Sequence, residues 1–131
     1  MASFGPTLLW LNVAFFVVYG LLFVFVPELV ATTITGSAPQ GSSSMIDFRA
    51  TYGGMTIAVG LVLAALARDP ALHATGLNSV LVVMLCMATG RTFGIVLDGD
   101  PNGWMWLFLA GELATAAAAF LSLRSQAVSE A

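Results

Sequence analysis

Residues 7–26 read TLLWLNVAFFVVYGLLFVFV, an apolar run without a charged side chain. A helix crosses the roughly 30 Å hydrocarbon core of a bilayer with about 20 mostly apolar residues, because it rises 1.5 Å per residue. No Lys or Arg precedes the run, and it exceeds the roughly 7–15 apolar residues of a signal peptide. The run therefore predicts a retained transmembrane helix that is closed by Pro27.

Three further stretches have a comparable length and apolar character: 45–67, 72–97 and 104–123. None of the four runs shows the period-two alternation of barrel strands, which excludes a β-barrel. They predict an all-α fold, an integral membrane four-helix antiparallel bundle, in a single domain over residues 1–131. The connection 68–71 is so short that the second and third helices must be antiparallel neighbours. Within the longest connection, 27–44, residues 28–34 form either a short interfacial helix or a plain linker.

The composition separates this chain from soluble proteins. Charged residues make up 8% of it, against roughly 25% in soluble domains, and the mean hydropathy is +0.95. Seven acidic residues against four arginines, with no basic cluster, argue against nucleic acid as a partner. Cys86 and His73 are each single residues of their type, which excludes an intrachain disulfide, bis-His haem and the common zinc sites. We expect neither a metal nor another cofactor.

The arginines indicate how the bundle is oriented. With four spans, both termini and the turn at Arg68 lie on one side of the membrane. That side carries Arg68 and Arg124, whereas the loops on the opposite side contain neither Lys nor Arg. By the positive-inside rule, both termini are therefore cytoplasmic. Trp104 and Trp106, at the start of the fourth helix, lie where an aromatic belt would place them.

Three ionisable residues fall within the outer half of the predicted spans. Arg91 lies about 10 Å below the outer end of the third helix, and Glu112 lies about 13 Å into the fourth. Arg49 belongs to the outer part of the second helix. An unpaired ion at such a depth costs about 2.5–3.5 kcal/mol on insertion scales. We therefore expect the three to converge inside the bundle, with Glu112 accepting hydrogen bonds from one or both guanidinium groups.

Three other polar residues are candidates for the same cluster. Asp47 either joins it or caps the second helix through the capping-box pattern Ser44-Met-Ile-Asp47. Tyr52 either directs its hydroxyl to an ion or simply packs as an interior aromatic residue. Asp98 lies on the same face of the third helix as Arg91.

Small residues predict where the helices approach closely. A Gly-x-x-x-Gly pattern at Gly90 and Gly94 predicts packing against another helix of the chain, the second or the fourth. Asn12 is expected to form a hydrogen bond between helices. On the second helix, one stripe follows the spacing i, i+3, i+4, i+7: Arg49, Tyr52, Gly53 and Thr56.

Several of these residues also carry a family resemblance. The segment Asp47-Phe-Arg49-Ala-Thr-Tyr52-Gly53-Gly54, followed by Gly60, is similar to the domain of unknown function 4345 family of small bacterial four-helix membrane proteins. The similarity continues through Gly90-Arg91-x-x-Gly94 and Asp98-Gly99 to Glu112. The resemblance implies the four-helix architecture and the same polar positions, but no activity. It agrees with a location in the bacterial cytoplasmic (inner) membrane.

These observations lead to one functional hypothesis and two alternatives. The hypothesis is a protein that binds a membrane lipid or a small polar or anionic ligand in an outward-facing pocket. Its expected lining comprises Arg49, Tyr52, Arg91, Glu112, Asp47 and Asp98. The first alternative is an accessory or structural subunit of a larger membrane complex, and a homo-oligomer would also be compatible with the sequence. The second is an isomerase-type enzyme that uses Glu112 for proton transfer. The sequence contains no nucleophile–base pair, phosphate loop or dinucleotide fingerprint, which favours a function without catalysis.

Overall fold

The computed structural model describes residues 4–129, with side chains for residues 4–127, and this part of the chain contains helices and no strand. The elements are α1 (Phe4–Phe25), α2 (Pro27–Thr35), α3 (Gly41–Phe48), the π-helix η1 (Arg49–Met55), α4 (Thr56–Ala67), the 3₁₀ turn η2 (Pro70–Leu72), α5 (His73–Asp98) and α6 (Gly103–Ser129). Four stretches are long and apolar enough to cross a membrane: Phe4–Phe25, Gly41–Ala67, Pro70–Asp98 and Gly103–Ala127. The prediction of an all-α fold with four membrane-spanning helices is confirmed.

Two helix boundaries differ from the expected ones by four residues or more. The second span begins at Gly41 rather than near residue 45, and Gly41 starts it with φ +77°, a conformation that glycine adopts easily. The fourth helix continues to Ser129 rather than ending at residue 123. Residues 124–129 include neither Pro nor Gly, so nothing in the polar segment stops the helix. Residues 1–3 and 130–131 of the expected domain lie outside the described part.

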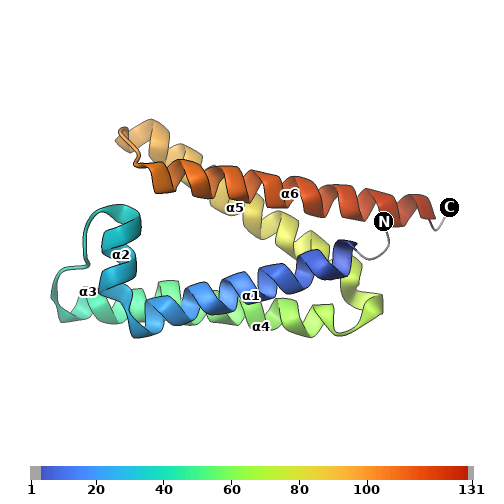
Figure 1. The fold of residues 1–131 in the computed structure, drawn as a ribbon, viewed down its shortest axis with the longest axis horizontal. Coiled ribbons are helices and arrows are strands. Elements are labelled where there is room, and N and C mark those ends of the chain that lie inside the picture. Colours follow the sequence, from blue (N-terminus) through green and yellow to red (C-terminus); the bar gives the residue numbers. More distant parts are fainter. Residues whose placement is uncertain (1–3, 130–131) are drawn as a thin grey trace.

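The connection after α1 contains a helix, α2, and not a plain linker. Pro27 occupies its first turn, and the helix ends at Gly36, whose φ of +83° is left-handed. The side-chain amide of Asn102 donates a hydrogen bond to the carbonyl oxygen of Ile34 (2.8 Å), which ties the end of α2 to the turn before α6. In Figure 1, α2 runs across the end of the molecule from α1 towards the turn between α5 and α6. It therefore bridges the two halves of the bundle at that end.

The helices form two antiparallel pairs, α1 with α4 and α5 with α6 (Figure 1). The pairs lie close together at the end where both termini are found, and they diverge towards the end where α2 lies. The buried core lies mainly in the half near the termini and comprises Leu8, Leu9, Phe16, Leu63, Ala67, Leu77, Val80, Met84, Ala116 and Ala119.

Glycine permits close packing between α1 and the second span. A Cβ atom added at Gly20 would lie 2.8 Å from the carbonyl oxygen of Gly53, and one at Gly60 would lie 2.8 Å from Val17 Cγ2. The prediction that Gly90 and Gly94 pack against another helix is wrong. A Cβ atom at Gly90 would meet no atom within 4 Å, and one at Gly94 would meet only Asp98 of the same helix.

The reason lies in which face of α5 is buried. This face carries Leu77, Val80, Met84 and Ala88 at helical spacing. Gly90 follows Ala88 by two residues, which turns it about 200° away from that face. The Gly-x-x-x-Gly pattern therefore lies on the outside of the chain.

Candidate functional site

A cavity of about 440 Å³ lies between the two helix pairs. Most of its wall is aliphatic or aromatic, and its polar lining residues are Asn12 and Tyr19 from α1, Thr56 from α4, Arg91 from α5, and Glu112 and Thr115 from α6. An apolar cavity with a few polar groups is typical of small-molecule sites. Residues from all four spans therefore line the cavity, and two of them, Arg91 and Glu112, are ionisable residues of opposite charge.

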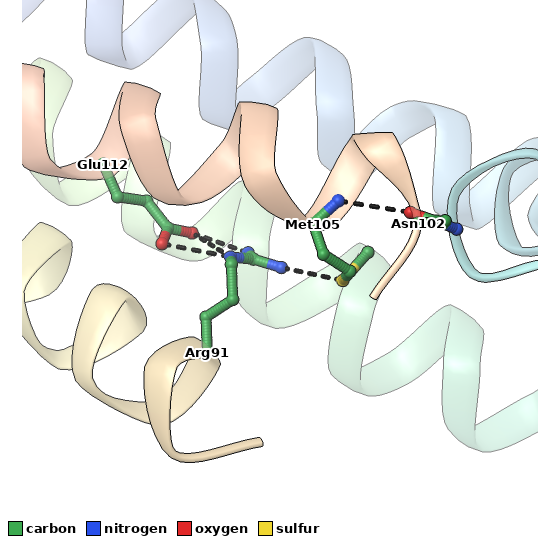
Figure 2. Close-up of polar contacts among 4 residues, drawn as sticks. All are labelled: Arg91, Asn102, Met105 and Glu112. Atoms are coloured by element: carbon green, nitrogen blue, oxygen red, sulfur yellow. Dashed lines mark hydrogen bonds and ion pairs between the residues drawn. The ribbon is translucent and has the colours of Figure 1, made fainter. Parts of the chain in front are cut away.

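Arg91 and Glu112 form a bidentate ion pair on the cavity wall. Arg91 Nη2 lies 2.6 Å from Glu112 Oε1, and Arg91 Nε donates to both carboxylate oxygens at 3.1 Å (Figure 2). The Glu112 side chain is 5% exposed and that of Arg91 is 20% exposed. The arginine–carboxylate contact that the depth of these residues predicts is present, and Glu112 is not left as an isolated buried charge.

The hairpin of α5 and α6 places these two side chains at the same level. Arg91 precedes the end of α5 by seven residues and Glu112 follows the start of α6 by nine. One face of α6 then completes the surroundings of the guanidinium group at the spacing i, i+3, i+7. Arg91 Nη1 lies 3.3 Å from Met105 Sδ (Figure 2), and Arg91 Cζ lies 5.2 Å from the centre of the Phe108 ring. A cation–π contact and a polarisable sulfur therefore add to the carboxylate.

Aromatic rings from α1 and α6 form the neighbouring part of the wall. Phe15 and Tyr19 stack with ring centres 5.5 Å apart, and Tyr19 meets Phe108 edge-on at 6.2 Å. Phe16, which is buried, packs edge-on against Phe15. This wall contacts apolar groups well and offers a hydroxyl at Tyr19.

Arg49 and Tyr52, which were expected in the pocket, lie elsewhere. Arg49 is exposed, and its Nη1 donates to the carbonyl oxygen of Val24 at the end of α1. Tyr52 is 48% exposed, and its ring lies 4.7 Å from that of Phe48 and 5.5 Å from that of Phe23. The prediction that Arg49 converges with the other two ions is therefore wrong.

Arg49 contacts the end of α1 and does not reach the cavity. Residues 49–55 form a π-helix, whose i→i+5 turns are wider than the 3.6-residue turns assumed in the predicted stripe. Within that stripe Arg49 and Gly53 both contact Val24, and the Tyr52 ring packs against the same last turn of α1. Thr56, at the end of the stripe, lines the cavity.

Asp47 and Asp98 also lie outside the cavity lining. The helix begins at Gly41 with Gln40 before it, so Ser44 lies inside α3, and the expected capping box is absent. Asp47 Oδ1 instead accepts a hydrogen bond from the Thr51 hydroxyl at 3.2 Å. Asp98 is exposed at the last position of α5.

The structure adds site residues that sequence reasoning missed. Asn12 was expected to bond between helices, but its amide nitrogen donates to the carbonyl oxygen of Leu8 in its own helix (2.8 Å), and the residue lines the cavity. Tyr19 follows Asn12 by seven residues and therefore lies on the same face of α1. Two polar groups at this spacing in an otherwise apolar run are a signal that could have identified both. Within residues 4–129, no three His, Cys, Asp or Glu side chains are placed to hold a metal ion.

The chain was compared with protein families, curated proteins and solved structures. A family model described as a domain of unknown function (DUF4345) matches residues 6–123. This range includes all the residues that line the cavity. No curated protein and no solved structure matches the chain.

Proposed function

We propose, from the premise that the chain belongs to the domain of unknown function family DUF4345, that this membrane protein binds an amphiphilic molecule between its two helix pairs. The ligand class is a membrane lipid or a small molecule with a polar or anionic head. The observation that carries the proposal is the mostly apolar 440 Å³ cavity with the Arg91–Glu112 pair on its wall. With both termini cytoplasmic, as the arginines predict, the Arg91–Glu112 pair of this cavity would lie in the outer half of the membrane.

The donors of Arg91 support a ligand head with an oxygen atom. A guanidinium group has five N–H donors. Arg91 directs Nε and Nη2 to Glu112, and Nη1 to the sulfur of Met105, which is a weak acceptor. The remaining donors can bind a ligand oxygen while Glu112 keeps the arginine paired. Because Glu112 neutralises Arg91, a neutral polar head is accommodated as readily as an anionic one.

The remainder of the cavity suits the apolar part of such a ligand. Its walls include leucine side chains from α1 and α6 and two methionines, Met84 and Met87, from α5. Methionine adapts its shape to irregular ligands because it is unbranched and flexible. The aromatic wall beside Arg91 offers flat contact surface. A chain or a ring system could be buried here.

A specific observation favours a second candidate function, an accessory subunit. Gly90 and Gly94 lie on the outer side of α5, where none of the other helices that the structure describes covers them. Small residues at four-residue spacing let helices approach closely in lipid. A helix of another protein, or of a second copy of this chain, would fit this face.

The isomerase alternative has less support. Proton transfer needs a carboxyl group that can exchange a proton with a substrate. Both oxygens of Glu112 accept hydrogen bonds from Arg91, and the side chain is 5% exposed. This arrangement favours a binding role over an acid–base role for Glu112.

Two glycine variants test the binding proposal by native mass spectrometry of the purified protein. Gly111 lines the cavity and a Cβ atom there would meet nothing within 4 Å, so Gly111→Leu places a new side chain at the wall of the cavity. Gly90 is equally open but does not line the cavity, so Gly90→Leu is the matched control. We expect an amphiphile to co-purify with the wild type and with Gly90→Leu, and to be lost from Gly111→Leu.

Two results would contradict the proposal. One is wild-type protein that carries no small molecule even when extracted under mild conditions. The other is equal retention of the molecule by both variants. Loss of a protein partner from Gly90→Leu, with ligand retained, would instead support the accessory-subunit function.

A further inference from the structure

A second cavity, of about 500 Å³, lies at the elbow where α1 turns into α2. This elbow cavity is lined by Phe25, Val26, Pro27, Glu28, Leu29, Thr32, Met45 and Arg49. It shares no lining residue with the cavity between the helix pairs. An inference about it is therefore independent of the proposed function.

The elbow cavity carries one cation and one anion that do not pair with each other. Arg49 lines it from η1 and Glu28 lines it from α2. Among the residues that the structure describes, Arg91 and Glu112 form the single salt bridge, so no ion pair joins Glu28 to Arg49. Arg49 donates from Nη1 to the Val24 carbonyl oxygen, which leaves other N–H donors of its guanidinium group for a ligand. A ligand that carries one negative and one positive group could pair with Arg49 and Glu28 at the same time.

The position of the elbow cavity in the membrane indicates what kind of molecule would bind there. α1 has 22 residues, which corresponds to about 33 Å and therefore to the thickness of the hydrocarbon core. Val24, which accepts the hydrogen bond from Arg49, lies in its last turn, so the elbow cavity lies at the level of the lipid head groups. Figure 1 shows α2 running across this end of α1, as an interfacial helix would.

The rim of the elbow cavity is apolar and exposed. Phe25 is 72% exposed and Leu29 is 67% exposed. Such side chains suit the glycerol and acyl part of a lipid next to a charged head group. We infer that the elbow cavity binds a zwitterionic phospholipid with a primary amine, with its phosphate against Arg49 and its ammonium group against Glu28.

Native mass spectrometry of the full chain in detergent tests this inference with three probe lipids of equal acyl chains: phosphatidylethanolamine, phosphatidylglycerol and phosphatidylcholine. We expect phosphatidylethanolamine to bind about two- to fivefold more tightly than the other two, which corresponds to one exposed ion pair. Phosphatidylglycerol lacks the ammonium group, and the quaternary amine of phosphatidylcholine cannot donate a hydrogen bond to Glu28. Equal binding of the three lipids by the wild type would overturn the inference.

Two variants separate the two halves of the head group. Glu28→Gln should lower phosphatidylethanolamine binding to the level of phosphatidylglycerol and leave phosphatidylglycerol binding unchanged. Arg49→Gln should weaken both lipids by a similar factor. Arg124→Gln, at the other end of the bundle, is the control and should preserve the lipid preference.

The remaining outcomes are also decisive. Because Glu28 is exposed, Glu28→Gln is expected to fold even if Arg49→Gln does not, and an unchanged lipid preference in Glu28→Gln would overturn the inference. Glycerophosphoethanolamine, which has the same head group without acyl chains, is added as a competitor. Displacement of the lipid by an equimolar amount of this soluble compound would assign the cavity to a soluble zwitterion and overturn the lipid assignment.

Discussion

Replacing Arg91 by alanine should destabilise the protein more than replacing Glu112 by glutamine. Arg91→Ala removes all the hydrogen bonds that Glu112 receives from the guanidinium group, and it strands a carboxylate that is 5% exposed. Glu112→Gln keeps an amide oxygen within reach of Arg91, whose side chain is 20% exposed and so retains some solvation. The two single variants therefore leave very different groups unpaired.

The structure sets the expected magnitudes. Stranding one partner of a buried pair costs about 3–5 kcal/mol in soluble proteins, and an ion at the helix centre costs about 2.5–3.5 kcal/mol on insertion scales. We expect about 3 kcal/mol for Arg91→Ala, which lowers the melting temperature by roughly 10 °C for a chain of this length. Glu112→Gln exchanges charge-assisted hydrogen bonds for neutral ones and should cost about 1–2 kcal/mol.

The assay is the temperature at which half of the monomer peak is lost in size-exclusion chromatography of the detergent-solubilised protein. The double variant Arg91→Met with Glu112→Leu is the control, because replacing both partners by apolar residues is often neutral or stabilising. We expect it to recover most of the stability and to lose the co-purified molecule. An equal loss of thermal stability in Arg91→Ala and in the double variant would show that an unpaired Glu112 charge is not what destabilises Arg91→Ala. This result would refute the reasoning.

Two further predictions concern packing and topology. Gly20→Ala should lower the melting temperature by several degrees, because its Cβ atom would lie 2.8 Å from the Gly53 carbonyl oxygen and such overpacking costs about 1–3 kcal/mol. The control Gly90→Ala places its Cβ atom in open space and should leave stability unchanged or slightly raised. A larger loss of stability in Gly90→Ala than in Gly20→Ala would contradict the packing of α1 on the second span. Reporter fusions at the two termini should both be active in the cytoplasm, because four spans place both ends on the side that carries Arg68 and Arg124; a C-terminal reporter active only outside would refute this orientation.

The number of spans and the level of the buried ions could be predicted from the sequence. Both depend on distance along a helix, which the 1.5 Å rise converts directly into depth in a bilayer of known thickness. Arg91 lies seven residues before the turn between α5 and α6, and Glu112 lies nine residues after it. The two side chains therefore have similar depths in the membrane, however the two helices are rotated against each other. The cost of an isolated ion in lipid then indicates a contact.

Which face of each helix meets a neighbour was decided only by the tertiary structure. This depends on the rotation of the helix about its axis, and apolar spans carry little information about it because lipid and protein interior are equally apolar. Arg49 bonds to the Val24 carbonyl oxygen at the end of α1 and therefore stays apart from the Arg91–Glu112 pair. The buried face of α5 excludes Gly90 in the same way.

The cavities also exist only at the tertiary level. The depths of Asn12, Tyr19, Arg91 and Glu112 follow from their positions in the chain, but a shared cavity requires the two helix pairs to diverge. That divergence depends on packing: the buried core holds the pairs together near the termini, and α2 bridges them at the other end. The sequence by itself therefore determined the spans and the depth of each polar group, and the packing of the helix pairs decided which of those groups face one another.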